Sequence, residues 1–275
     1  MKVFKPLIKP LTSSRDRVGE CPVWSASEQA LYWVDIEGKH IHRFDWQSKT
    51  QQTWTTDERV GCIACTESVE GEKRVIAAME TGIFDVELLP TLQTKSRLLA
   101  AVEHPIQNMR FNDGRCDSQG RFWVSTMCMD MAAAKQVGAV YCLDKDGLGA
   151  PKVEGLITPN GMAFSPVDMT AHPGRPDGAA IDVNGSYWIC ANDAGKIHQF
   201  SPQGELISSL NVPVSKPSMC AFGGPEMNIL FVTSIQPAVA VGNEVGLSGA
   251  VFSVELNVKG QIEPCFSRFP DNFSS

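Results

Sequence analysis

Long apolar runs are missing from this 275-residue sequence. No window approaches the roughly 20 consecutive apolar residues that a membrane-spanning helix needs, so we expect no contact with a membrane. The N-terminal stretch MKVFKPLIKPLTSS alternates Lys and Pro where a secretory signal would need a continuous apolar core. These absences predict a cytoplasmic protein.

Positive charge is also scarce. The chain has 24 Lys and Arg against 31 Asp and Glu, a formal net charge of -7. Proteins that bind nucleic acid cluster Lys and Arg to meet the phosphate backbone, and no such run occurs here. We therefore predict no nucleic-acid partner.

The nine cysteines do not form a recognisable metal or disulfide framework. Their number is odd, and they are spread through apolar, strand-like segments, where a free Cys acts as a small buried hydrophobe. Cys62 and Cys65 form the one Cys-x-x-Cys pair in the sequence. Because a structural zinc site needs four ligands, we favour a packing role for this pair.

Helix signals are scarce, and what the chain has instead is short apolar or alternating runs between Gly, Pro, Asp and Asn clusters. These runs predict an all-β protein, with residues 1–275 forming one domain. Several runs resemble one another around a large central residue, and the spacings between these residues are 43, 47, 65 and 43. Repeats of about 40 to 50 residues are typical of β-propeller blades. The equivalent residues are Trp33, Ile76, Trp123, Trp188 and Phe231.

The third interval is too long for one blade and too short for two. It predicts a six-bladed β-propeller in which one blade, around residues 160–178, is severely reduced. A sandwich with an ordinary loop at this position is the alternative. If the outer strands of that blade are absent, two sheet edges are left open, which a second copy of the chain could cover in a homo-oligomer.

Polar residues beside Pro or Gly precede several of the predicted inner strands. In a propeller these strands surround one central channel, so equivalent side chains converge on one point. Carboxylate and amide oxygens that meet in this way suit a hard divalent cation such as Ca, Mg or Mn, and tolerate Zn. For each residue alone, a turn or cap role is the simpler interpretation. The residues are Glu20, Asn112, Asn160 and Asp177.

These runs resemble the family of senescence marker protein (regucalcin), gluconolactonase and luciferin-regenerating enzyme. The resemblance extends from about residue 15 to residue 255 and is carried by an ordered set of short runs. It implies a six-bladed propeller with one divalent cation in the channel and hydrolysis of a sugar lactone. The runs are GECPVW at 19–24, RFNDG at 110–114, PNGMAFSP at 159–166, GRPDGAA at 174–180 and CAFGGP at 220–225.

The resemblance also implies roles for individual residues. The metal ligands would be Glu20, Asn160 and Asp177, and Asp177 would also act as the catalytic base. The cation is one of Ca, Zn, Mg or Mn. The residues that contact a sugar lactone would be Arg110, Asn112 and, less securely, Asp130.

The chain departs from the family pattern at three places. Cys21 follows the metal-binding Glu where the family usually has Gly, and Asp130 stands where relatives tend to have Glu. The strands that relatives have between the Asn-Gly run and the Arg-Pro-Asp-Gly run are almost absent. Two alternatives therefore accompany the predicted lactonase: a divalent-metal-binding or regulatory protein with impaired catalysis, and a hydrolase of the phosphotriesterase type.

Overall fold

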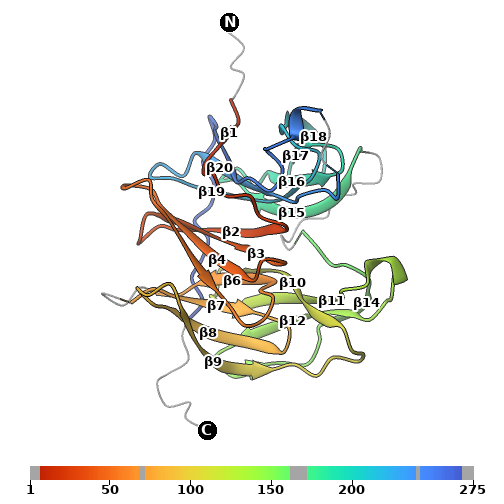
Figure 1. The fold of residues 1–275 in the computed structure, drawn as a ribbon. Helices are drawn as coiled ribbons and strands as arrows, with labels where there is room; N and C mark the ends of the chain where they lie inside the picture. The colour runs from red at the N-terminus through yellow and green to blue at the C-terminus, as the bar shows by residue number, and fades with distance from the viewer. Residues whose placement is uncertain (1–6, 68–71, 162–171, 240–241, 268–275) are drawn as a thin grey trace, which may run out of the picture.

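The computed structural model describes residues 7–67, 72–161, 172–239 and 242–267. Over these residues the chain forms antiparallel sheets that follow one another around a common centre (Figure 1). Three of the sheets are simple meanders, in which consecutive strands are hydrogen-bonded neighbours, and the other two depart from this pattern at one edge. This arrangement is a β-propeller, and the predicted all-β class is confirmed.

The first three sheets use consecutive strands of the N-terminal half of the chain. In the third sheet, β13 and β14 both pair with β12. The strands are β2 (Gly19–Ser25), β3 (Ala30–Asp35), β4 (His40–Asp45) and β5 (Gln51–Thr55); β6 (Cys62–Cys65), β7 (Arg74–Ala78), β8 (Gly82–Leu88) and β9 (Thr94–Ala101); and β10 (Met109–Cys116), β11 (Phe122–Cys128), β12 (Gly138–Asp144), β13 (Gly147–Leu148) and β14 (Val153–Leu156).

The last two sheets come from the C-terminal half, with one strand added from the N-terminus. The short strand β1 pairs with β21, which fixes the N-terminal segment to the last sheet and so closes that end of the ring. Two 3-10 helices, η1 (Met131–Ala133) and η2 (Gly242–Glu244), lie in connections. The strands are β15 (Arg175–Ile181), β16 (Tyr187–Asn192), β17 (Lys196–Phe200) and β18 (Leu206–Asn211); and β19 (Pro217–Gly223), β20 (Ile229–Ser234), β21 (Phe252–Glu255) and β1 (Lys9–Pro10).

The predicted number of six blades is wrong for the part of the chain that the structure describes, which forms five sheets. The predicted reduced blade around residues 160–178 falls partly on residues 162–171, which lie outside the described residues. Its C-terminal part, from Arg175, is instead the first strand of a complete sheet. Among the described residues, the 65-residue interval between Trp123 and Trp188 spans the rest of the third sheet, the segment 157–161 and the start of the fourth sheet.

The inner strands follow one another in the order β15, β19, β2, β6 and β10. At the two ends of this series, β10 and β15 are linked by residues 159–161. Pro159 accepts hydrogen bonds from Asn112 and Ser125 of the third sheet, and Gly161 accepts one from Tyr187 of the fourth. The connection thus runs along the inner side of the ring between these two sheets.

Apolar side chains fill the spaces between neighbouring sheets. The largest buried cluster joins the first three sheets and includes Trp54 and Phe122. A second cluster joins the fourth and fifth sheets around Trp188 and Phe252. At the seam between the first and fifth sheets, the ring of Trp24 stacks on Phe231 with centroids 5.7 Å apart.

A repeated turn holds the first two strands of the third and fourth sheets together. The Oδ1 atom of Asp182 accepts backbone N–H bonds from the residues two and four positions later, both at 2.9 Å, and its Oδ2 accepts the indole N–H of Trp188 at 3.0 Å. Asp117 makes the same three contacts, with the indole of Trp123 at 2.8 Å. The pattern Asp-x-x-Gly-x-x-Trp therefore stabilises the turn before each of these two aromatic strands.

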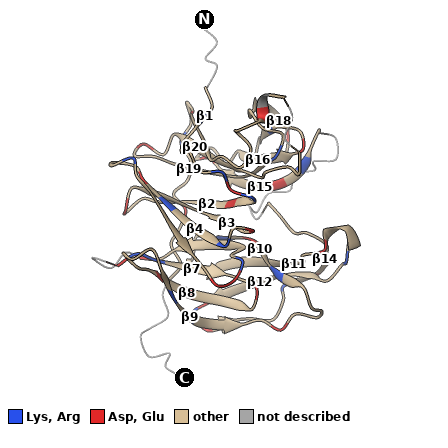
Figure 2. Cartoon of the chain, in the orientation of Figure 1, with Lys and Arg blue, Asp and Glu red and all other residues tan. Residues whose placement is uncertain are grey.

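Charged residues are scattered over the blades, with Lys and Arg interspersed among Asp and Glu (Figure 2). This distribution agrees with the absence of a basic run in the sequence. The described residues contain no helix with the length and apolar character needed to cross a membrane.

The Asp182 turn gives the first prediction. Asp182→Ala should lower the free energy of unfolding by about 2–4 kcal/mol, because it leaves a buried indole N–H and two backbone N–H groups without an acceptor. Asp182 is fully buried. Asp146→Ala is the control, since Asp146 is exposed and pairs with Lys145 at the surface, and its loss should change stability by less than about 0.5 kcal/mol. Urea unfolding measures both variants; equal losses would contradict the structural role of Asp182.

Candidate functional site

A cavity of about 300 Å³ opens where the inner strands begin. Its lining comes from β2, β10, β15 and the connection at residues 158–160. Five of the six residues predicted from the sequence line it, so side chains that are up to 157 positions apart in the chain meet at one place. They are Glu20, Arg110, Asn112, Asn160 and Asp177.

A break in strand register accompanies the site residues. Pairing between β2 and β3 shifts after Glu20, pairing between β10 and β11 shifts around Asn112, and pairing between β15 and β16 shifts around Asp177. The inner strand of the fifth sheet has the same irregularity after Pro217. A bulge re-aims the side chains of a strand, and here the repeated bulge brings a polar side chain from three different sheets to the cavity.

Cys21 shows how the chain accommodates a side chain where the family usually has Gly. Its φ of 46° lies in the left-handed region that favours glycine. Its Sγ accepts the backbone N–H of Ile63 at 3.2 Å and lies 3.4 Å from the carbonyl oxygen of the same residue. Burial raises the pKa of the Cys21 thiol, so the group stays neutral and serves as part of the wall between the first two sheets.

A chain of hydrogen bonds fixes the third sheet to the connection. Arg110 donates from Nη1 to Oδ1 of Asn112 at 2.8 Å, and Asn112 donates from Nδ2 to Oδ1 of Asn160 at 2.6 Å. Asn112 also donates to the carbonyl oxygen of Pro159 at 3.1 Å. The Asn160 side-chain oxygen is therefore held at the cavity, and its second lone pair remains available to a ligand.

Asp177 is 7% exposed, and Nδ2 of Asn192 donates to its Oδ2 at 2.7 Å. Burial, which Asp113 reinforces, raises the pKa of Asp177 to about 7. The pKa of Glu20 is also raised, first by loss of solvent and then by the negative charges of Asp177 and Asp113. Two carboxylates in one desolvated space disfavour each other's ionised form, so without a cation the site favours protonated carboxyl groups.

The donor set fits a hard divalent cation. Glu20 and Asp177 supply carboxylate oxygens, Asn160 supplies an amide oxygen, and the buried Oδ1 of Asn192 has no hydrogen-bond partner among the described residues. Oxygen donors with this charge suit Ca, Mg or Mn rather than a metal that prefers sulfur ligands. Over the described residues, no group of three His, Cys, Asp or Glu side chains is placed to hold a metal, and the predicted set contains only two such residues.

Two residues at the site were not predicted from the sequence. Asn192 ends β16, and Asp113 lies next to Asn112 and is 6% exposed. The RFNDG run contained a signal for Asp113, because it adjoins a predicted site residue. No local pattern marks Asn192, which reaches the cavity only because β16 pairs with β15.

Asp130 does not line the cavity. Its side chain is exposed and accepts the backbone N–H of Ala133 at 3.3 Å, which caps η1. The neighbouring Met129 and Met131 line the cavity instead. The predicted substrate contact of Asp130 therefore stays a prediction.

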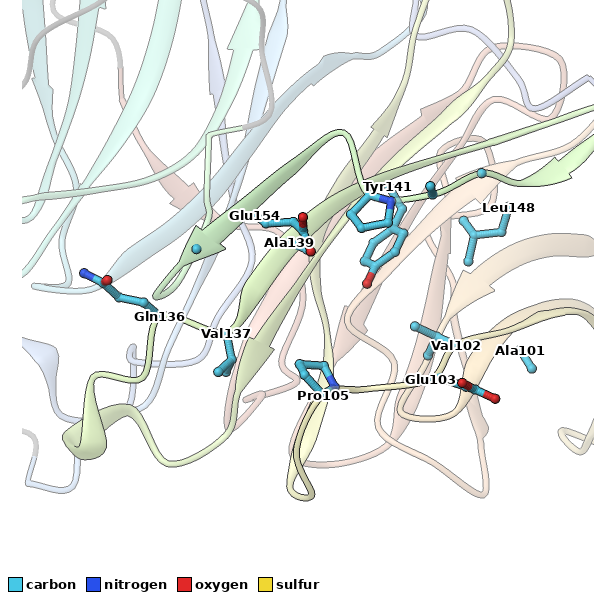
Figure 3. Close-up of a pocket in the computed structure, with 14 residues that line it drawn as sticks. Ala101, Val102, Glu103, Pro105, Gln136, Val137, Ala139, Tyr141, Leu148 and Glu154 are labelled. Atoms are coloured by element: carbon cyan, nitrogen blue, oxygen red, sulfur yellow. The ribbon is translucent and has the colours of Figure 1, made fainter.

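A larger cavity, of about 720 Å³, lies away from the site beside the outer strands of the third sheet. Tyr141 of β12 extends into it, with Val102 and Pro105 on another side (Figure 3). None of the predicted site residues lines this cavity.

Comparisons with known proteins show which family the chain resembles. The family model described as "SMP-30/Gluconolactonase/LRE-like region" matches residues 18–171 and 167–236. The chain is 31% identical to 6-deoxy-6-sulfogluconolactonase of Pseudomonas putida, over 91% of this chain and 95% of that protein. A solved luciferin-regenerating enzyme superposes with a TM-score of 0.86 at 24% identity, covering 96% of this chain and all of that one.

A second solved structure, of a calcium-binding protein described as regucalcin from Agrobacterium tumefaciens, has the same TM-score of 0.86 at 20% identity and covers 96% of this chain and 99% of that one. These two structures share the fold. From the family match and the relative that is 31% identical, the chain belongs to the SMP-30/gluconolactonase/LRE-like family.

Proposed function

We propose that the chain is a metal-dependent hydrolase that opens a sugar lactone. The observation that carries the proposal is the desolvated pair of carboxylates, Glu20 and Asp177, in one cavity with the side-chain donors of Arg110 and Asn112. Membership of a family that includes lactonases supports the choice of substrate class.

Glu20, Asn160 and Asp177 would hold the divalent cation. When bound, the cation supplies Lewis acidity to a carbonyl oxygen in the cavity. Asn192 positions this arrangement, because its Nδ2 fixes one oxygen of Asp177 and leaves the other oxygen unconstrained by that bond.

Asp177 is the group that takes a proton. The oxygen of a water molecule attacks the lactone carbonyl carbon, and Asp177 accepts the proton that this water loses. The bond between the carbonyl carbon and the ring oxygen then breaks, and the proton is delivered to that oxygen as it becomes a hydroxyl. Without metal, burial raises the pKa of Asp177 to about 7; a bound cation would lower this pKa, because positive charge favours the ionised carboxylate, so Asp177 would be ionised at neutral pH and able to accept the proton.

Arg110 and Asn112 orient the substrate. Arg110 is 9% exposed, and its Nη1 is fixed by Asn112 and by the backbone oxygen of Phe111. These two bonds fix the orientation of the guanidinium. Because the guanidinium is planar, the directions of its other N–H groups are fixed as well. A sugar has many hydroxyl oxygens that such donors can bind, so these two residues select the orientation in which the carbonyl faces Asp177.

Hydrolysis tests the proposal directly. The purified protein should hydrolyse glucono-δ-lactone, a chelator should abolish this activity, and a divalent cation should restore it. Asp177→Asn should lower kcat by about 100-fold or more, because a general base contributes on that scale. Asp146→Asn, at the surface, is the control.

Equal kcat for Asp177→Asn and the wild type would contradict the role of Asp177. Binding of a cation without turnover of any lactone would favour the binding or regulatory alternative. Turnover of a phosphotriester, with no lactone hydrolysed, would favour the phosphotriesterase alternative.

The raised pKa of Asp177 also predicts how stability depends on pH without metal. The folded state favours the protonated carboxyl, whereas in the unfolded chain its pKa is near 4. The stabilising effect of protonation is thus complete below about pH 4 and is lost as pH rises to about 7. With a chelator present, we expect urea unfolding to show a loss on the order of 2–4 kcal/mol between pH 5 and pH 8.

Asp177→Asn should reduce this pH dependence, with Glu20, whose pKa is also raised, accounting for the rest, and should be more stable than the wild type at pH 8, because it has no charge to desolvate. A variant whose stability follows pH in the same way as the wild type would show that Asp177 is not the titrating group.

A further inference from the structure

A second cluster of charge lies at the rim of the cavity. Arg175, at the start of β15, lines the cavity, and its Nε donates to Oδ2 of Asp193 at 2.7 Å. Lys216 donates to the other oxygen of the same carboxylate. Two cations therefore share one anion, so this side of the rim carries a net charge of about +1.

The Asp193 carboxylate fixes the position of both cations. It follows Asn192, which lines the cavity, and has a φ of 70° in the turn between β16 and β17. Lys216 and Arg175 hold the pKa of Asp193 below its ordinary value, so the carboxylate stays ionised. The Arg175 side chain is 67% exposed, and its free N–H groups can therefore reach a ligand from solvent.

A group of the reverse charge also lines the cavity. Glu37 lines the cavity and pairs with Arg59 at 3.0 Å. Arg59 also pairs with Glu80 at 3.2 Å, so one cation is shared by two anions. The lining of the cavity thus includes the cation of Arg175 and the anion of Glu37.

Arg110 does not provide a competing anion site. It lies deeper, and the acidic groups that act on it include Glu37 and Glu20. Their negative charge offsets that of the guanidinium, so an anionic group on a substrate gains less there than at the rim. Arg175 lines the same cavity as Asp177, and its positive charge lowers the pKa of Asp177.

We propose that Arg175, with Lys216 behind it, selects sugar lactones that carry an anionic group at the end remote from the lactone carbonyl. The inference rests on the proposed lactonase function and names its substrate class. With the carbonyl at Asp177, the remote end of the sugar extends to the rim, where the anionic group meets Arg175 and is repelled from Glu37. Phosphate, sulfonate and carboxylate groups share the chemistry that a guanidinium recognises.

The test compares kcat/KM for three lactones: neutral glucono-δ-lactone, the same lactone with a sulfonate at carbon 6, and the same lactone with a phosphate at carbon 6. The wild type should prefer the anionic lactones. Comparing the sulfonate with the phosphate shows whether the protein favours a monoanion or a dianion. Arg175→Gln should reduce the ratio of anionic to neutral kcat/KM by about 10-fold or more, the range of a charge-assisted hydrogen bond. Lys216→Gln should reduce the ratio by less.

Arg97→Gln is the matched control, because Arg97 is also exposed and pairs with one aspartate, Asp85, on the outer side of the second sheet. It should leave the ratio unchanged. The preference of the wild type should also fall at high salt, since the rim charge is exposed.

The outcomes separate the two proposals. If no lactone is hydrolysed, the proposed function fails. If lactones are hydrolysed but the wild type has no anionic preference, or Arg175→Gln keeps that preference, the role of Arg175 is wrong while the lactonase stands. A loss of the ratio in Arg97→Gln as well would show a general charge effect and would also overturn the assignment to Arg175.

Discussion

Desolvation of two like charges is the constraint on which the site depends. Glu20 and Asp177 come from different sheets, and both have raised pKa values because the cavity removes solvent and places them within range of each other and of Asp113. A site of this kind is unfavourable when it is empty and ionised. A proton or a cation would remove this repulsion. The free energy of unfolding should therefore depend on whether the site is protonated or occupied.

The ring supplies the rigidity that such a site requires. Strands in each sheet are fixed by backbone pairing, and buried aromatic residues fill the spaces between sheets. The Asp117 and Asp182 turns hold aromatic strands in place at the end of the inner strands away from Arg110 and Asp177. Near the cavity, the inner strands instead have bulges. The same strand is therefore regular where it packs and irregular where it presents a polar side chain.

Much of this architecture could be predicted from the sequence, because each blade repeats a similar run of residues at a regular spacing. Trp33, Trp123 and Trp188 each lie in a second strand, as the spacing required. The number of blades could not be predicted in the same way. Spacing counts residues and does not distinguish a reduced blade from a long connection. Within the Trp123 to Trp188 interval, residues 159–161 bond to both the third and the fourth sheet.

The residues of the candidate site could also be predicted only in part. Asn160 and Asp177 lie in recurring runs flanked by Pro or Gly, and this recurrence predicts that their side chains share one site. Asn192 could not, since its contact with Asp177 depends on strand pairing. Asp130 was assigned by resemblance, and the local turn directs its carboxylate to Ala133 instead.

The central claim is that Glu20, Asn160 and Asp177 together bind one cation. Anomalous X-ray scattering from crystals grown with Mn²⁺ measures this most directly, because it locates the ion without any assumption about activity. The account predicts one strong peak in the cavity, within bonding distance of oxygens from all three residues. A peak elsewhere, or a cavity without a peak at saturating Mn²⁺, would contradict it.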